Sequence, residues 1–237
     1  MKIWFFFAIL FLSATTGFSQ PTVASSHEFD LYQKAGGGGV AAFKTGYGSD
    51  ADGSQFFLPD WQKGDVVLKN NTVFNNGLLL TYDKVRQELF IKQGESSEVL
   101  TGNKDDIETF SLHDGDKQYY FISSSRYSDT RPVVFYQILT GDSSKLTLLK
   151  YTKGTFVKAD NSDLMKTRQG NVNDAFVDKI TYYIAKENGL LEILVLKSKA
   201  LKKAFANLNI NIEKYLNEHP GSVDEDYLIS MVAELNK

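Results

Sequence analysis

The sequence predicts a mainly β, α+β fold: an antiparallel β-meander that forms a sandwich or a partly open barrel, followed by two to three C-terminal helices. Three observations carry this prediction. Turn dipeptides separate short apolar runs, two of these runs are apolar on both strand faces, and the apolar period becomes helical after Lys197. Tight turns join antiparallel neighbours, because parallel strands need a long crossover.

Residues 1–19 have the pattern of a signal peptide. Lys2 supplies a positive charge, Ile3–Leu12 is an unbroken apolar run, and Gly17–Ser19 has the small-x-small form that signal peptidase accepts. An uncleaved anchor and a buried core segment are the alternatives. The apolar run is about half of the roughly 20 residues that span a bilayer, so we expect cleavage before Gln20.

The chain contains no cysteine. It therefore has no disulfide, no thiolate metal ligand and no lipid-carrying cysteine of the kind that bacterial lipoproteins have at their cleavage site. Together with the signal peptide, this predicts a periplasmic or extracellular protein that is not a lipoprotein and keeps no stable membrane anchor after cleavage.

The charge pattern argues against nucleic acid as a partner. The formal net charge is −3 and the densest basic stretch contains four lysines, which helical spacing scatters around a solvated face: Lys197, Lys199, Lys202 and Lys203. Binding to phosphates needs a clustered basic face instead.

Residues 20–54 form a predicted flexible leader. The run Gly36–Gly39 costs too much backbone entropy to lie within a regular element. A few apolar residues are candidates for tethering the leader to the body: Phe29, Leu31, Tyr32 and Phe43.

Residues 55–197 form the predicted β domain. Its expected hairpin turns are Asn76-Gly77, Asp114-Gly115, Gly141-Asp142 and Asn188-Gly189, because these residues tolerate the positive φ of tight turns. Val133–Thr140 and Leu190–Leu196 are apolar on both faces. We therefore expect both to be central strands that are covered on both sides.

Residues 198–237 form the predicted helical segment. Ser198 and Asn209 are the expected caps of two helices, and Ser222–Glu225 is a capping box that opens a third. The apolar stripes are narrow, so these helices should pack on the sheet or on each other.

Several motifs recur in a known family. Gly53–Phe90 contains Trp61, then Lys63-Gly64 and a Leu-rich strand, and the tail contains the Tyr-rich strand Thr181–Ile184 and the basic helix Ser198–Phe205. In these features most of the chain after the leader resembles a family of uncharacterised secreted β-rich proteins of Gram-negative bacteria. The motifs are structural, so the resemblance implies a fold and a compartment but no catalytic residue. The long glycine-rich leader departs from the family pattern.

No catalytic or metal-binding pattern emerges from the sequence. The three histidines (His27, His113 and His219) have no metal-clamp spacing, and no GxSxG or phosphate-binding loop occurs. Asp50–Ser54 is similar to the start of a calcium-binding loop. Such a loop needs a carboxylate at its twelfth position, which counted from Asp50 is Trp61, a residue that cannot bind calcium. We predict no catalytic residue, no cofactor and no metal.

Aromatic side chains are the remaining candidates for a binding surface. A strand tyrosine can bind a sugar or a peptide when it is exposed, or pack at the rim of the core. The candidate binding residues are Trp61, Tyr82, Tyr119, Tyr120, Tyr182 and Tyr183.

Export without a catalytic constellation indicates a non-catalytic protein of the cell envelope that binds an envelope protein, a glycan or a small apolar ligand. One alternative is a small-ligand carrier with a barrel-like pocket. A second is a hydrolase whose carboxylates converge from separate strands. A dry interior would argue against the carrier, two facing carboxylates in a cleft would favour the hydrolase, and an exposed aromatic or apolar patch would favour partner binding.

Overall fold

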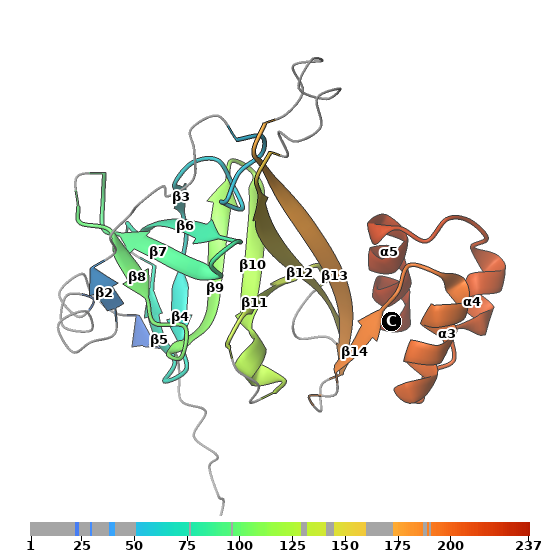
Figure 1. Ribbon diagram of the computed structural model, residues 1–237. Coiled ribbons are helices and arrows are strands. Elements are labelled where there is room, and N and C mark those ends of the chain that lie inside the picture. Colours follow the sequence, from blue (N-terminus) through green and yellow to red (C-terminus); the bar gives the residue numbers. More distant parts are fainter. Residues whose placement is uncertain are drawn as a thin grey trace, which may run out of the picture.

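The described residues form one mostly antiparallel sheet followed by three helices. The computed structural model describes residues 22–23, 29, 38–40, 51–75, 77–95, 97–128, 132–140, 145–159, 173–186, 189 and 191–237. Within these residues fourteen strands belong to a single sheet, and the helices follow it at the C-terminus (Figure 1). The predicted mainly β, α+β fold is confirmed. The predicted signal peptide, residues 1–19, lies outside the described residues.

Most strands are short, and two neighbours have twelve residues each. The strands are β1 (Thr22–Val23), β2 (Gly38–Val40), β3 (Gln62–Lys63), β4 (Val66–Leu68), β5 (Thr72–Phe74), β6 (Leu79–Asp83), β7 (Glu88–Lys92), β8 (Leu100–Gly102), β9 (Ile107–Asp114), β10 (Lys117–Ser123), β11 (Phe135–Ile138), β12 (Leu146–Val157), β13 (Ala175–Lys186) and β14 (Leu191–Leu194). A short 3-10 helix, η2 (Ser124–Arg126), follows β10, and the C-terminal helices are α3 (Ser198–Asn207), α4 (Glu213–Glu218) and α5 (Glu225–Leu235).

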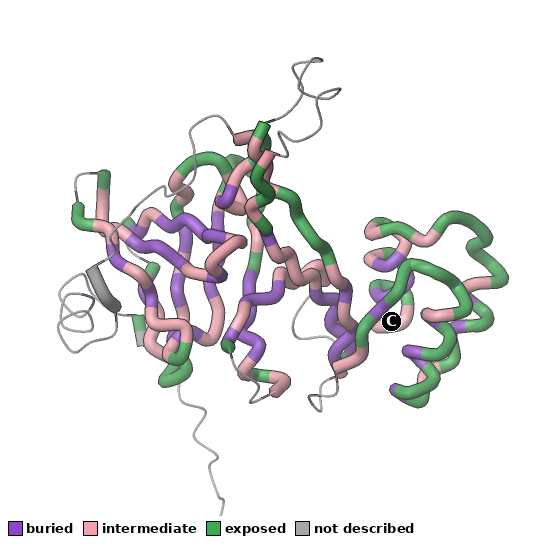
Figure 2. Tube along the Cα trace, viewed as in Figure 1, coloured by how far each residue is buried: buried purple, intermediate pink, exposed green. Residues whose placement is uncertain are grey.

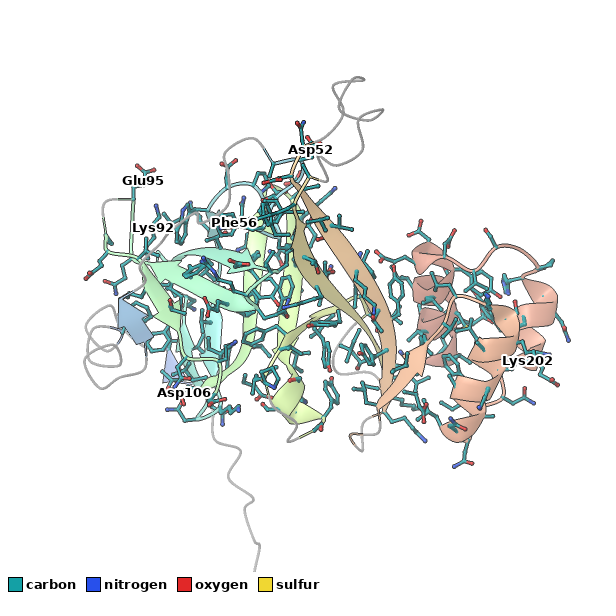
Figure 3. The ribbon with its side chains drawn as sticks, in the orientation of Figure 1. Asp52, Phe56, Lys92, Glu95, Asp106 and Lys202 are labelled. Atoms are coloured by element: carbon teal, nitrogen blue, oxygen red, sulfur yellow. The ribbon has the colours of Figure 1, made fainter. Side chains whose placement is uncertain are left out.

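The sheet branches at β9, and its described strands end at β14, β2 and β1. Its strand order is β14-β13-β12-β11-β10-β9-β3-β6-β7-β8-β2, while β4 pairs with β9, β5 with β4 and β1 with β5. The named strands pair antiparallel apart from β1, which runs parallel to β5. The longest ladder joins β12 to β13. At the outer end of this ribbon Asp52 forms a bridge with Ala175 (Figure 3).

Gly64 lies between two consecutive short strands, β3 and β4, that pair with different neighbours. β3 precedes Gly64 and pairs with β6, whereas β4 follows it and pairs with β5; both also pair with β9. A Cβ atom at position 64 would overlap the Ser111 carbonyl oxygen and lie 2.8 Å from Leu80 Cδ1. Glycine therefore permits the close crossing at which the sheet divides into two layers.

The first core lies between these two layers. β6, β7 and β8 fold back over β4, β9 and β10, and buried residues concentrate along these strands (Figure 2). Phe110 and Phe121 stack with their ring centroids 4.5 Å apart, and Tyr82 lies 5.3 Å from Phe121. Aromatic rings therefore fill the interior of this part of the sheet.

The second core lies between the sheet and the helices. Apolar residues of β12, β13 and β14 pack against all three helices: Leu146, Leu148, Tyr182, Ile184 and Leu194 from the sheet, and Leu201, Phe205, Tyr215, Leu228, Met231 and Val232 from the helices. The expectation that the helices pack on the sheet is confirmed.

Glu225, the first residue of α5, links the helices to the sheet. The Tyr182 hydroxyl donates to Glu225 Oε2 at 2.7 Å, and Lys150 Nζ lies 2.7 Å from the same oxygen. Burial disfavours the carboxylate, but the hydrogen bonds from Lys150 and Tyr182 outweigh it and lower the pKa of Glu225 below its usual value. Charge-assisted hydrogen bonds thus fix the start of α5.

Strand register separates the two faces of the sheet. Both cores lie against the face that carries Phe121, Leu148 and Ile184, which we call the core face. The opposite face, which we call the groove face, carries a row of directly paired residues from β9 to β13: Ser111, Tyr120, Ile138, Leu149 and Tyr183.

A few residues of the predicted leader, 20–54, are described, and they contact the body. Phe29 is 2% exposed and packs edge-on against Phe74, which confirms it as a tether; the other three predicted tethers lie outside the described residues. Gly38–Val40 forms β2 on β8. The expectation that the glycine run avoids regular elements is wrong for both glycines of β2, because the edge of β8 supplies backbone hydrogen bonds that offset the entropic cost.

Two hairpin predictions are confirmed and one is wrong. Asp114-Gly115 joins β9 to β10, and Gly189, at a φ of 82°, lies between β13 and β14. Gly141-Asp142 lies between the paired strands β11 and β12 but outside the described residues. Asn76-Gly77 joins no hairpin, because β5 pairs with β4 and β1 whereas β6 pairs with β7 and β3. The division of the sheet at Gly64 sends these strands into different layers.

One of the two predicted central strands is central. β11, in Val133–Thr140, lies between β10 and β12. The prediction for Leu190–Leu196 is wrong, because β14 ends the sheet and, within the described residues, pairs with β13 alone. The helices cover Leu194 on the core face, while Ile193 on the groove face is 57% exposed. An apolar strand face is therefore not always covered by another element of the fold.

The three predicted helices are present, but the expected caps are wrong. Ser198 is the first residue of α3 rather than its cap, and Asn209 follows Leu208, the C-cap of α3, at a φ of 57° instead of capping α4. Asp224, not Ser222, caps α5, and its Oδ1 accepts the Tyr227 N–H at 2.9 Å. Within the described chain, no helix combines the length and the apolarity that crossing a membrane requires.

Replacing Gly64 tests the crossing between the layers. We expect Gly64→Ala to lower the free energy of unfolding by about 3 kcal/mol, the upper part of the usual cost of overpacking, because the opposing atom belongs to the backbone and cannot rotate away. Urea denaturation measures this change. Gly221→Ala is the control, since a Cβ atom there meets nothing within 4 Å, and its effect should stay within about 0.5 kcal/mol. Equal effects of the two substitutions would contradict the assignment.

Candidate binding groove

A groove of about 510 Å³ opens on the groove face over β4, β9, β10 and the end of β11. Its polar lining comes from Asp65, Thr109, Ser111, Gln118, Tyr120 and Thr140, and Val67 and Ile138 supply apolar contacts. Phe110 and Phe121 also border it, but their side chains belong to the first core, so the strand backbone there forms the floor. The volume lies within the range of small-molecule sites.

Backbone pairing brings Asp65 and Ser111 together at this floor. The Ser111 N–H donates to the Asp65 carbonyl at 2.9 Å, and the Asp65 N–H donates to Ser111 Oγ at 3.2 Å. The Ser111 hydroxyl also lies 3.3 Å from Asp65 Oδ2. Ser111 is 4% exposed, whereas the Asp65 side chain is 41% exposed. The buried serine therefore holds an accessible carboxylate in place.

His113 joins this pair through one ring nitrogen. His113 Nε2 lies 3.0 Å from Ser111 Oγ and 3.8 Å from Asp65 Oδ2. In a Ser-His-Asp hydrolase the acid instead binds Nδ1 and orients the ring from the far side. Because both contacts here involve Nε2, these three residues do not form the relay of a Ser-His-Asp hydrolase.

Tyr120 forms the aromatic wall of the groove. The side chain is 50% exposed, and its hydroxyl donates to Gln118 Oε1, two residues earlier on the same strand face. Ile138 is its direct neighbour on β11, and Val67 pairs with Thr109 on the other side. A polar floor thus meets an aromatic wall and two apolar flanks.

Further along the groove face lies a tyrosine cluster: Tyr127, Tyr136, Tyr151 and Tyr183. The ring centroid of Tyr136 is 5.2 Å from that of Tyr183 and 5.9 Å from that of Tyr151. Burial, followed by the neighbouring tyrosines, raises the pKa of Tyr136 to about 12. Burial also raises the pKa values of Tyr151 and Tyr183. These three hydroxyls are therefore uncharged at neutral pH.

Two of the six candidate binding residues lie on the groove face. Tyr120 lines the groove, and Tyr183 belongs to the tyrosine cluster. Tyr82 is 2% exposed in the first core and its hydroxyl donates to Gln87 Oε1 at 2.7 Å, while burial raises its pKa well above the usual value. Tyr182 lies in the second core and donates to Glu225.

The remaining two candidates lie elsewhere. Tyr119 packs against the first core, with its ring centroid 5.2 Å from that of Phe57. Trp61 precedes β3, and Lys92 Nζ lies 4.7 Å from its ring centroid. The six residues therefore do not form one site.

Asp65, Ser111 and Gln118 carry no sequence motif that singles them out. A weaker signal is present in Thr109–His113, which alternates polar and apolar residues and so places three polar side chains on one face of β9. The residues opposite them on β4 and β10 depend on strand pairing, which this alternation does not reveal.

The described residues contain no group of three side chains suited to hold a metal ion. The ring of His219 stacks on that of Tyr215 with centroids 4.2 Å apart. His27 lies outside the described residues, as does Asp50 of the calcium-like stretch.

Comparison of the chain with protein-family models, with curated proteins and with solved structures gives no match.

Alkaline pH tests the tyrosine cluster. The folded state holds the Tyr136 proton up to a pKa of about 12, whereas the unfolded chain releases it near pH 10. The stabilisation is complete below pH 10 and is lost as the pH rises toward 12. We expect the free energy of unfolding of Tyr136→Phe to fall less across this window than that of the wild type, as measured by urea titration. At pH 7 the difference in free energy of unfolding between the variant and the wild type gives the effect of packing alone. If the two free energies fell in parallel as the pH rises, the prediction would be contradicted.

Proposed function

We propose that this chain is an exported, non-catalytic protein of the cell envelope that acts by binding a ligand in the groove on its sheet. The observation that carries the proposal is the groove of about 510 Å³, in which Asp65, Gln118 and Tyr120 present polar and aromatic groups beside apolar flanks. Recognition sites commonly combine a few fixed polar groups with apolar contact in this way.

The signal-peptide pattern of residues 1–19 and the resemblance to secreted β-rich proteins support export. The absence of cysteine supports a protein without a lipid anchor.

The groove favours binding over the two alternatives. A carrier for apolar compounds needs an interior pocket, whereas aromatic rings fill the core between the sheet layers. A hydrolase with paired acids needs two facing carboxylates, and Asp65 is the single carboxylate among the described lining residues.

Export is tested at the N-terminus of the mature protein. When bacteria produce the full chain, we expect the protein in the periplasmic or extracellular fraction, and intact-mass spectrometry should show that it begins at Gln20. Retention of Met1 in that fraction would overturn the cleavage site, and confinement to the cytoplasm would overturn the export proposal.

Binding is tested by sedimentation with isolated envelopes of the producing bacterium. We expect the purified mature protein to co-sediment, and Tyr120→Ala combined with Asp65→Asn to reduce the bound fraction about tenfold, because the substitutions remove the aromatic wall and the accessible charge. Asp60→Asn with Ile193→Ala is the matched control, since Asp60 is exposed outside the groove and Ile193 is exposed on β14. Equal sedimentation of all three proteins would exclude the groove.

A further inference from the structure

We infer that the ligand of the groove is a neutral saccharide, with one sugar ring stacked on Tyr120 and its hydroxyl groups bonded to Asp65 and Gln118. This inference rests on the proposed binding function and adds the chemical class of the ligand.

Tyr120 supplies the surface for the apolar side of a sugar ring. Half of this side chain is exposed, and the bond from its hydroxyl to Gln118 restrains the ring at the edge of the groove. A pyranose has C–H groups on its faces and hydroxyl groups around its rim. An aromatic wall beside polar groups therefore matches both parts of such a ring at once.

The polar groups next to Tyr120 suit neighbouring hydroxyls. Gln118 Oε1 accepts from Tyr120, which leaves its amide nitrogen as the donor that this side chain offers a ligand. The accessible Asp65 carboxylate is an acceptor, held by Ser111. A sugar hydroxyl both donates and accepts, so a donor and an acceptor on the two sides of one groove each pair with hydroxyls of the same ligand.

The charge of the groove selects among saccharides. Asp65 is negative, and no lysine or arginine occurs among the described lining residues. A uronate would therefore bring a second negative charge toward Asp65 in a lining that holds no cation, which disfavours acidic sugars.

The strand arrangement argues against a peptide. Extended peptides bind by adding a strand to an open sheet edge. β9 and β10 form the floor of the groove, and both are interior strands. β10 pairs with β9 and β11, and β9 pairs with β10, β3 and β4. Their backbone groups are already used in the sheet, so recognition in the groove depends on side chains.

An apolar ligand is also disfavoured. It would cover Asp65, Gln118 and Thr109 without replacing the hydrogen bonds that these groups make with water. Polar groups that remain unpaired on binding subtract from affinity, whereas a saccharide pairs them.

Calorimetry with defined tetrasaccharides tests the inference. The probes are neutral chains of glucose, N-acetylglucosamine, mannose or galactose, together with tetragalacturonate as the acidic probe. We expect the mature protein to bind at least one neutral probe, and to bind tetragalacturonate at least about tenfold more weakly. We expect Tyr120→Ala and Asp65→Asn each to weaken binding of the neutral probe about tenfold, whereas Tyr120→Phe keeps most of the affinity because it keeps the ring.

Asp60→Asn and Ile193→Ala are the matched controls and should leave the affinity unchanged. Urea denaturation of every variant shows that a loss of binding does not come from unfolding. Failure of all neutral probes, or preference for tetragalacturonate, would overturn the saccharide assignment. If envelope sedimentation still depended on the groove, the binding function would survive with a ligand of another class; if it did not, both proposals would fail.

Discussion

The close contact between Gly64 and the carbonyl of Ser111 is the constraint on which the architecture depends. Before Gly64 the chain pairs with β6 as strand β3, and after it the chain pairs with β5 as strand β4. Both strands pair with β9. The crossing lets the hairpin of β6 and β7 fold back over β9 and β10, which encloses the first core. It also sets Asp65 directly against Ser111, so the contact that divides the sheet also builds the floor of the groove.

The first and second cores lie on the same face of the sheet, whereas Ile122, Leu149 and Ala185 are buried on the opposite face, where the tyrosine cluster packs against them. The folded-back strands cover one part of the core face and the helices cover another, with Glu225 linking α5 to Tyr182 and Lys150 (Figure 1). The opposite face presents the groove and, beyond it, the tyrosine cluster. Because the floor strands are paired on both sides, that face offers side chains rather than backbone groups for recognition.

Neighbouring side chains hold the polar and aromatic groups of the groove in place. Ser111 is buried and contacts Asp65 and His113, while Gln118 restrains Tyr120 from the neighbouring position on its strand face. Groups held in this way lose little further conformational freedom when a ligand binds, which favours affinity for a small polar ligand.

The sequence by itself determined the fold class, the change from strands to helices after Lys197 and the hairpin at Asp114-Gly115, because turn chemistry and apolar period are local properties. Tertiary structure alone decided that β5 and β6 separate, that β14 ends the sheet and that β2 includes glycines. It also decided that Asp65, Ser111 and Tyr120 meet in one groove while Tyr82 and Tyr182 are buried. These outcomes depend on strand register and on which surfaces cover one another, and such non-local contacts leave no periodic signal in the chain.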